Sequence, residues 1–347
     1  MQSLATFYRP AEFKDVISQS SIIQVLERQL STNTFVNNYL FCGPSGCGKT
    51  TIARIFAYKL NEYRDENNNL HSSEPIEIDG ASNNGVDNIK MLIQNAKERS
   101  VDGKYKVFII DECHMLTIQA WNAFLKCIEE PPKYTIFIFC TTDPQKIPAT
   151  ILNRVMRFNL TKISQDKIKD RLRYICEQEH FTNYEECIDY VSKLANGGMR
   201  DAIALLEKCA GYSSDLNIQN VLTCLGNFSY KVMFQLTNSI IDANQQELIR
   251  IIESLFNDGN DLKLFIEQYL DFVLDLDKYC VFKNMSMLKI PQSLEEDIKY
   301  ATGVEDNINY YNWLVNQLLQ IKFNLKQDSN IKTTLEIMLL SIAKGIK

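Results

Sequence analysis

The sequence lacks the features that would place it in a membrane or in an oxidising compartment. It has no apolar run of about 18 residues, which excludes an ordinary membrane-spanning helix. Its first residues carry no basic segment followed by an apolar one, so no secretory signal is evident. The ten cysteines form no C-x-x-C pair, and several lie inside apolar runs. This favours reduced, buried thiols, and we expect a cytoplasmic protein without a membrane partner.

The charge balance gives no global attraction to nucleic acid. Lys and Arg number 37 against 43 Asp and Glu, for a formal net charge of −6. A contact with DNA must therefore come from a local basic patch or from backbone amides. The 45% apolar share is ordinary for a globular chain, and 347 residues allow two or three domains.

One stretch carries a strong chemical signal. The sequence Gly-Pro-Ser-Gly-Cys-Gly-Lys-Thr at 43–50 matches G-x-x-x-x-G-K-[ST] at every fixed position, between an expected strand and an expected helix. Its glycines and amides would wrap a phosphate, and Lys49 would reach the β- and γ-phosphates. The alternative, a Gly-rich turn with a surface lysine, is disfavoured by the complete match. The predicted ATP-binding residues here are Gly43, Pro44, Ser45, Gly46, Cys47, Gly48, Lys49, Thr50 and Thr51.

A second signal is the apolar run 107–110 that ends in Asp111 and Glu112. A buried strand of a parallel sheet would deliver both carboxylates to the edge where ligands bind. We expect Thr50 and Asp111 to hold Mg²⁺ and Glu112 to polarise the attacking water. An acidic helix cap is the alternative for the pair alone.

Short apolar runs alternate with amphipathic segments up to about residue 160. This alternation predicts an α/β fold with a parallel sheet covered by helices on both faces. The expected strands are 39–42, 76–79, 106–110, 135–140 and 156–160, and the expected helices are 20–31, 51–57, 87–99 and 117–130. The polar stretch 61–73 is predicted to be an exposed loop.

Beyond residue 160 the strand pattern stops. Residues 162–225 predict three or four short helices, and the remainder is helical in pattern to its end. We therefore predict three domains, at 1–160, 161–222 and 223–347.

Six further motifs are found along the sequence. They are Tyr8-Arg9-Pro10, Asp111-Glu112-Cys113-His114, Glu129-Glu130-Pro131-Pro132, the run Thr-Thr-Asp-Pro-Gln-Lys-Ile-Pro at 141–148, Ile151-Leu152-Asn153-Arg154 and Gly197-Gly198-Met199-Arg200-Asp201-Ala202. Together they resemble the AAA+ clamp-loader ATPases, most closely those of the bacterial DNA polymerase III gamma/tau type. The resemblance extends from residue 6 to about 226 and fades in the C-terminal helices.

The resemblance implies roles for individual residues. Thr142 would be a first sensor near the γ-phosphate, and Arg200 a second sensor on a small helical lid domain. Arg154 would act in trans, as an arginine finger in the neighbouring subunit's site. A set of residues would lie by the adenine and ribose: Tyr8, Arg9, Pro10, Val16 and Ile17.

The chain departs from the family pattern at two places. Where the family has Ser-Arg-Cys, this chain has Asn153-Arg154-Val155, so Arg157, one helical turn away on a helical reading, is a substitute candidate for the finger. The four-cysteine zinc module of the family has no counterpart in 61–73, and we expect no zinc. The additional C-terminal domains of the longer tau form are also missing, which indicates a short form.

DNA contact is the least defined role. Residues 82–86 could present amides to a phosphate at a helix N-terminus, with Asn84 and Gly85 as the expected contacts. Lys90 is the expected basic contact, and Lys97 and Arg99 could add charge. A solvated helix face is an equal alternative.

The family implies a clamp-loader subunit of a DNA polymerase III-like holoenzyme. Such a subunit binds and hydrolyses ATP, opens a sliding clamp, and loads it onto primer-template DNA without sequence specificity. Its partners would be the clamp, the DNA and other loader subunits in a pentamer, with the C-terminal helices as an oligomerisation collar. The alternatives are another AAA+ DNA-processing ATPase, such as a branch-migration motor or helicase loader, and a nucleotide-binding replisome scaffold without turnover.

Overall fold

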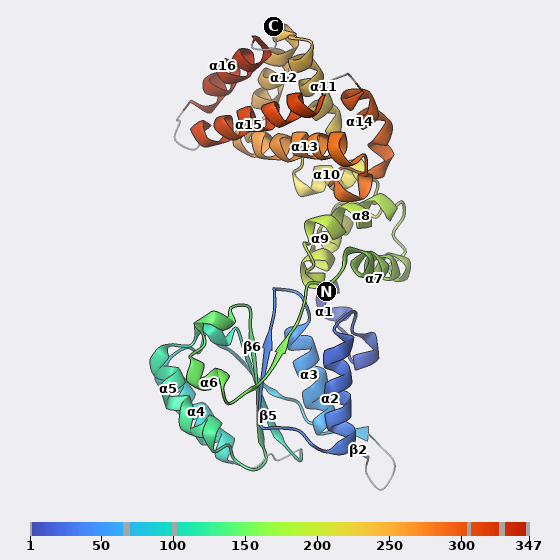
Figure 1. Ribbon diagram of the computed structural model, residues 1–347. Helices are drawn as coiled ribbons and strands as arrows, with labels where there is room; N and C mark the ends of the chain where they lie inside the picture. The colour runs from blue at the N-terminus through green and yellow to red at the C-terminus, as the bar shows by residue number, and fades with distance from the viewer. Residues whose placement is uncertain (1, 65–69, 99–102, 304–306, 326–329, 345–347) are drawn as a thin grey trace. The chain divides into compact units, whose positions relative to one another are not determined.

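The computed structural model describes residues 2–64, 70–98, 103–303, 307–325 and 330–344 (Figure 1). The chain divides into two compact units. The first consists of Met1–Leu172 and Ala195–Ala204, and the second of Arg173–Leu194 and Leu205–Lys347. Each is described by itself.

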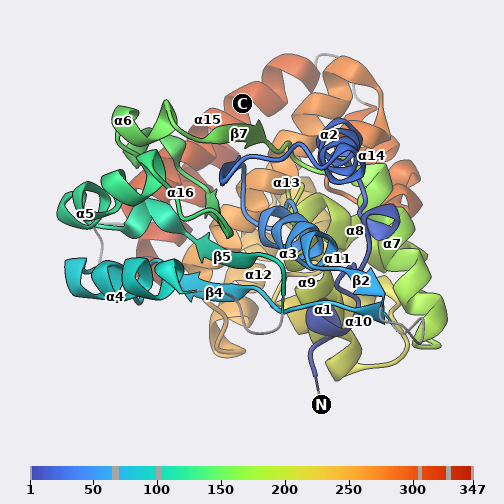
Figure 2. The same cartoon turned by 90° about the horizontal axis from the view of Figure 1, so that it is seen from below.

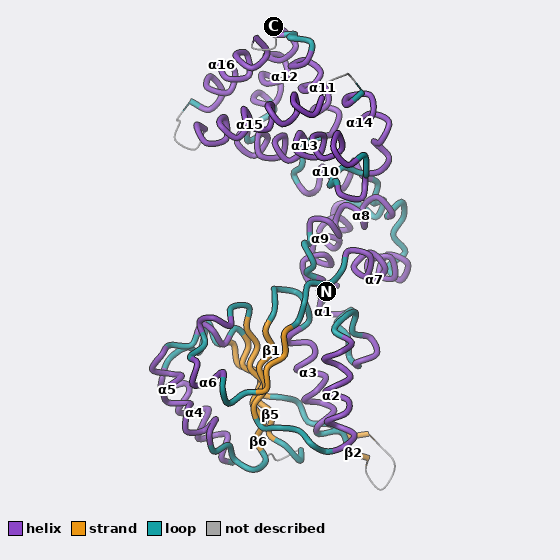
Figure 3. The backbone as a smooth tube through the Cα atoms, viewed as in Figure 1, coloured by secondary structure: helices purple, strands orange, loops and turns teal. Residues whose placement is uncertain are grey.

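The first unit contains a five-stranded sheet in the order β4-β5-β6-β1-β7 (Figure 3). All its pairings are parallel, as the sequence predicts. Every residue of the two central strands β6 and β1 is buried, which a parallel sheet covered on both faces requires. The five strands are β1 Asn38–Cys42, β4 Ile76–Asp79, β5 Lys106–Asp111, β6 Thr135–Thr141 and β7 Met156–Asn159.

Helices cover both faces of this sheet (Figures 1 and 2). Helices α2 (Ser20–Thr32) and α3 (Lys49–Leu60) pack on one face, and α4 (Val86–Lys97) and α5 (Ile118–Glu129) on the other. Alternate residues of each strand enter the two cores; Phe41 packs with the first pair of helices and Leu40 with the second. The predicted helices of this unit are thus confirmed, with ends shifted by a few residues.

The capping residues explain where α5 begins and ends. The Thr117 hydroxyl oxygen accepts a hydrogen bond from the backbone N–H of Ala120 at 3.1 Å, a regular N-cap. The helix ends at Glu129, before the Pro131-Pro132 pair that cannot continue it. Helix α4 stops at Lys97, because the backbone of Glu98 is extended, and the last predicted residue, Arg99, lies outside the described residues.

The prediction of an open loop over 61–73 is wrong in part. Strands β2 (Tyr63–Arg64) and β3 (Leu70–His71) pair antiparallel, and residues 65–69 lie outside the description. The polar composition suggested a loop. Two short strands can nevertheless pair through backbone hydrogen bonds, which do not depend on the kind of side chain. Buried Asn61 anchors the base of this hairpin, since its side chain exchanges two 2.8 Å hydrogen bonds with the backbone of Tyr105.

The second unit is all-helical. Four helices, α7 to α10, occupy the region where three or four were predicted, and the unit boundaries fall inside α7 and α9. The division into three domains stays a prediction. The helices are α7 Gln165–Gln178, α8 Glu185–Leu194, α9 Met199–Tyr212, α10 Ile218–Leu225, α11 Tyr230–Ile241, α12 Gln245–Asn257, α13 Leu262–Phe282, α14 Glu295–Thr302, α15 Asn307–Leu325 and α16 Ile331–Lys344.

The C-terminal helices share one hydrophobic core. The predicted stripe Leu314, Leu318, Ile321 and Leu325 of α15 is buried there against α13. The hydroxyls of Thr237 and Tyr269 are buried in this core and form a hydrogen bond with each other at 2.9 Å.

Of the described helices, none has the length and apolarity to cross a membrane. The short elements are α1 Leu4–Phe7, α6 Ala149–Leu152, η1 Phe13–Asp15, η2 Cys113–Met115, η3 Pro144–Lys146, η4 Met285–Met287 and η5 Gln292–Leu294.

The predicted burial of the cysteines is confirmed for nine of them, and their reduced state stays a prediction. All ten are free; nine are buried, and Cys224 is half-buried. Burial raises the pKa of most of these thiols, Cys140 among them, so they are poor nucleophiles.

Candidate functional site

The loop between β1 and α3 adopts the phosphate-wrapping path that its glycines allow. Gly46 has φ of +68° and Gly48 has φ of +102°, a region that disfavours residues with a Cβ. The carbonyl of Gly46 accepts a hydrogen bond from the N–H of Met199 at 3.0 Å. A Cβ on Gly46 would lie 3.0 Å from the Cα of Gly198, so the loop and the start of α9 approach too closely for a side chain.

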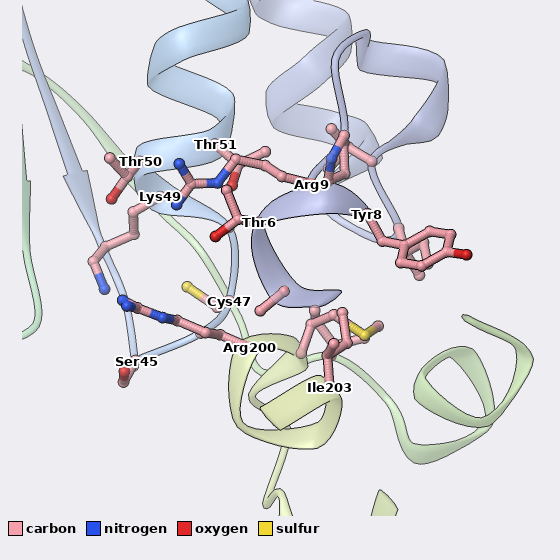
Figure 4. Close-up of a pocket in the computed structure, with 18 of the residues that line it drawn as sticks. Thr6, Tyr8, Arg9, Ser45, Cys47, Lys49, Thr50, Thr51, Arg200 and Ile203 are labelled. Carbon is pink, nitrogen blue, oxygen red and sulfur yellow. The ribbon is translucent and has the colours of Figure 1, made fainter. Parts of the chain in front are cut away.

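A cavity of about 200 Å³ lies above this loop (Figure 4). The N-terminal segment, the loop, the end of β5 and the start of α9 all contribute to its wall. The predicted nucleotide contacts among its lining residues are Tyr8, Arg9, Pro10, Val16, Ile17, Ser45, Gly46, Cys47, Gly48, Lys49, Thr50, Thr51, Asp111, Glu112 and Arg200. Gly43 and Pro44 lie just below, as partners of Lys49.

Lys49 is not a surface lysine. It is 6% exposed, and its Nζ donates hydrogen bonds of 2.9 Å to the carbonyls of both Gly43 and Pro44. The carbonyls of the loop thus hold the ammonium beside the cavity. This burial argues against the alternative in which Lys49 is a solvated surface lysine.

Thr50 and Asp111 form the predicted oxygen pair. The Thr50 hydroxyl donates to Asp111 Oδ2 at 2.7 Å, and Asp111 Oδ1 accepts from the N–H of Glu112 at 2.9 Å. A hydroxyl and a carboxylate at this separation are the donor types that Mg²⁺ prefers, so these residues fit that ion.

Glu112 is held by its neighbours. Its φ of +44° is rare for a residue with a side chain, and such strain is found mostly at functional sites. The Thr142 hydroxyl donates to Glu112 Oε2 at 3.1 Å, which brings the predicted sensor against the predicted catalytic carboxylate. His114 Nδ1 lies 3.2 Å from Glu112 Oε2 and 3.2 Å from Thr141 Oγ1.

The cavity wall carries more positive than negative side chains. Its cations are Arg9, Lys49, Arg171 and Arg200, against the carboxylates of Asp111 and Glu112. This excess favours a polyanionic ligand.

Sequence reasoning missed part of the wall. Arg171, on α7, donates from Nη2 to the carbonyl of Tyr8 at 2.8 Å. Its guanidinium carbon lies 6.0 Å from the centre of the Tyr8 ring. Ile163, Met199 and Ile203 add apolar surface. No motif marks Arg171, Ile163 or Ile203, because only the fold brings their segments to the P-loop. Met199 lies inside the motif at 197–202, but the sequence assigned it no role of its own.

Arg154 lies elsewhere in the first unit. Its Nη2 is 2.9 Å from Glu129 Oε1, and its Nη1 donates to the carbonyl of Thr150 at 2.6 Å. It precedes β7 and therefore lies at the amino-terminal edge of the sheet, whereas the cavity is at the carboxyl edge. The proposed substitute Arg157 rested on a helical turn, and that premise is wrong: Arg157 is on strand β7, where its Nε donates to Asn159 at 2.8 Å.

The predicted DNA contacts surround the start of α4. Asn84 is exposed, and its carbonyl accepts from the N–H of Thr117 at 3.2 Å. Gly85 is the residue before α4, and Lys90 is exposed with Asp87 at 3.5 Å. Both the phosphate contact and the solvated face fit this geometry, and the contact stays a prediction.

Known proteins resemble most of this chain. A family model described as DNA polymerase III, delta subunit, matches residues 18–164. The DNA polymerase III subunit tau of Bacillus subtilis is 37% identical, over 79% of this chain and 51% of that protein. The DNA polymerase III subunit gamma of Buchnera aphidicola subsp. Schizaphis graminum is 31% identical, over 100% of this chain and 99% of that protein. Several other relatives are longer, and the chain spans about half their length.

A solved structure shows the fold. The Thermotoga maritima RuvB Holliday junction branch migration motor superposes with a TM-score of 0.52, over 76% of this chain and 90% of that one. At 19% identity, the likeness concerns the fold alone.

Proposed function

Since the chain belongs to the DNA polymerase III gamma/tau family, we propose that it is an ATP-hydrolysing subunit of a clamp loader. It would open a sliding clamp and load it onto primer-template DNA, as part of a DNA polymerase III-like holoenzyme in the cytoplasm. Its partners would be the clamp, the DNA and other loader subunits, in a pentamer. The helices after residue 222 would form the collar, and 161–222 the lid.

One observation supports ATP hydrolysis above the others. A single cavity brings together the phosphate-wrapping loop with Lys49, the Thr50–Asp111 oxygen pair, and Glu112 held by Thr142. These residues come from three separate parts of the sequence: the loop and the start of α3, the end of β5, and the residue after β6. A nucleotide-binding scaffold without turnover would require the phosphate-wrapping loop. It would not require the strained Glu112 carboxylate beside that loop.

The residues divide the work of phosphoryl transfer. The loop amides and Lys49 would hold the β- and γ-phosphates, while Thr50 and Asp111 would hold Mg²⁺. Bound there, the ion would neutralise charge on the phosphate oxygens. Glu112 would orient the attacking water, and Thr142 would keep the Glu112 carboxylate in position.

Arg154 supports an assembly in which sites lie between subunits. It is at the sheet edge opposite its own cavity, so it cannot reach a nucleotide bound to the same chain. Its side chain is 39% exposed, so a neighbouring subunit's nucleotide could replace Glu129 as its partner. Arginine fingers supplied in trans contribute roughly 10³–10⁵ in rate in GTPases.

The proposal includes further contacts and one absence. Asn84, Gly85 and Lys90 would contact DNA phosphates without reading sequence. No zinc would be bound, since 61–73 holds no cysteine.

A clamp-loading assay tests the proposal. The purified chain, with the other loader subunits of its source, would transfer a labelled sliding clamp onto singly primed circular DNA in the presence of ATP and Mg²⁺. We expect transfer with ATP and none with the Lys49→Ala variant. A branch-migration motor is the second candidate, favoured only by the shared fold. Native mass spectrometry separates the two, because five subunits indicate a loader and a ring of six a motor.

A further inference from the structure

Arg9 is a half-buried cation in the cavity wall whose surroundings do not balance its charge. Among the residues that the structure describes, its side chain has no hydrogen-bond or ion-pair partner. The nearest carboxylates are Glu77 and Asp111. Glu77 forms an ion pair with Arg54, and Asp111 accepts the hydroxyl of Thr50. Both carboxylates are thus engaged already.

The position disfavours a positive charge. Burial lowers the pKa of the Arg9 guanidinium, and repulsion from Arg54 and Arg200 lowers it further. A cation kept where its charged form is destabilised gains stability only when an anion comes to it. Because Arg9 lines the cavity of the phosphate loop, the anion is one that binds in this cavity.

The backbone fixes the direction of this side chain. The N–H of Arg9 donates to the carbonyl of Thr6 at 3.3 Å, and the carbonyl of Tyr8 accepts from Arg171 at 2.8 Å. Figure 4 shows the guanidinium directed towards the start of α3, where Thr50 is labelled, while the Tyr8 ring points the opposite way. Arg9 therefore faces the phosphate end of the cavity and not the base.

The pair Thr50–Asp111 identifies which phosphates are near. Thr50 and Asp111 would hold Mg²⁺, which would neutralise charge at the phosphate end of the nucleotide. Asp111 is one of the charged neighbours of Arg9, so the guanidinium lies at this end of the triphosphate. A guanidinium suits phosphate oxygens, because its planar N–H groups can donate two parallel hydrogen bonds.

We propose that Arg9 binds the terminal phosphate of the nucleoside triphosphate and lets the N-terminal segment 3–10 distinguish a triphosphate from a diphosphate. The proposal rests on the proposed ATPase function. It assigns Arg9 a different place from the base and ribose position that the family resemblance implies. When the terminal phosphate leaves, Arg9 loses that counter-charge, and the segment loses a contact with the nucleotide.

Isothermal titration calorimetry of the full chain tests this assignment. The probes are ADP and the non-hydrolysable β,γ-imido analogue of ATP, each with Mg²⁺. For Arg9→Gln, we expect the affinity for the analogue to fall about tenfold or more, the usual effect of losing a charge-assisted hydrogen bond. The affinity for ADP should change by less than about threefold. Arg9→Lys should recover part of the lost affinity for the analogue, because lysine restores the positive charge but not the planar N–H groups of the guanidinium.

A melting experiment separates this role from a structural one. Without nucleotide, Arg9→Gln should melt no lower than the wild type, since the substitution relieves repulsion; with the analogue, its thermal shift should be smaller. Lys14→Gln is the matched control, since Lys14 is exposed, lies in the same region and pairs with Glu12 outside the cavity.

The outcomes are distinguishable. Equal losses for ADP and the analogue, no loss for either, or a lower melting point without nucleotide would overturn the assignment while leaving the ATPase proposal in place. Failure of the wild type to bind either nucleotide would contradict both.

Discussion

Replacing Thr50 by valine isolates the metal-binding half of the site. Threonine and valine side chains have nearly the same shape, so Thr50→Val removes the hydroxyl without opening a cavity. The hydroxyl donates to Asp111 at 2.7 Å, and a hydrogen bond to a charged group contributes about 1.5–3 kcal/mol. Because the pair is only partly buried, we take the lower end, about 1.5 kcal/mol. For a unit of this size, that lowers the melting temperature by about 3–6 °C.

The larger effect concerns magnesium. Thr50→Val removes one of two side-chain oxygens that fit the ion, so the Mg²⁺ concentration for half-maximal ATPase activity should rise about tenfold or more. ATP binding in EDTA should change by less than about twofold, since the loop amides and Lys49 hold the phosphates without the ion.

The assay is a magnesium titration of ATPase activity, together with ATP binding in EDTA. Thr223→Val is the control: its hydroxyl bonds the carbonyl of Gln219 within α10, away from the cavity. An unchanged magnesium titration, or an equal loss of ATP binding in EDTA, would refute the reasoning.

Three other substitutions, one of them with a matched control, test separate parts of the account. Glu112→Gln should keep ATP affinity within about threefold and lower turnover by about 100-fold or more; rapid turnover, measured by phosphate release, would remove Glu112 from its role. Gly46→Ala should lower the free energy of unfolding by about 1–3 kcal/mol in denaturant titrations, because φ is +68° and its Cβ would meet Gly198. Gly211→Ala, inside α9 with open space around it, should instead stabilise by about 0.5–1 kcal/mol, and equal effects would contradict the strain argument. Arg154→Ala, mixed with wild-type subunits, should silence the neighbouring site while its own site still binds ATP; a defect confined to its own site would disprove action in trans.

The inner strands β1, β5 and β6 could be predicted because each is a nearly continuous apolar run, whereas the edge strands β4 and β7 include charged residues. Buried parallel strands need such runs on both faces, and β5 and β6 show them without ambiguity. The hairpin of β2 and β3 could not be predicted, because backbone pairing between two-residue strands leaves no pattern in the side chains. The choice of Arg157 as a substitute for Arg154 assumed a helical turn between them, although residues 156–160 were themselves predicted to be a strand. Strand β7 confirms the strand prediction and contradicts the helical turn.

The residue pattern alone predicted the position of site residues only where they directly follow a strand in the sequence. The loop with Lys49, and the pair Asp111 and Glu112, follow strands directly, so local sequence predicts their position. Arg171 comes from α7 and was missed, because its approach depends on how distant segments pack. The charges that act on Arg9 could not be predicted from the sequence either. Arg54, Glu77 and Asp111 are distant from Arg9 in the chain and come near it only in the folded structure.

The most direct test of the central claim is the steady-state ATPase rate of the assembled chain, measured alone, with primed DNA, with the cognate clamp and with both. The account predicts strong stimulation that requires clamp and primed DNA together, and no activity in the Lys49→Ala variant. A rate indifferent to the clamp would contradict the loader assignment, although the site would remain that of an ATPase.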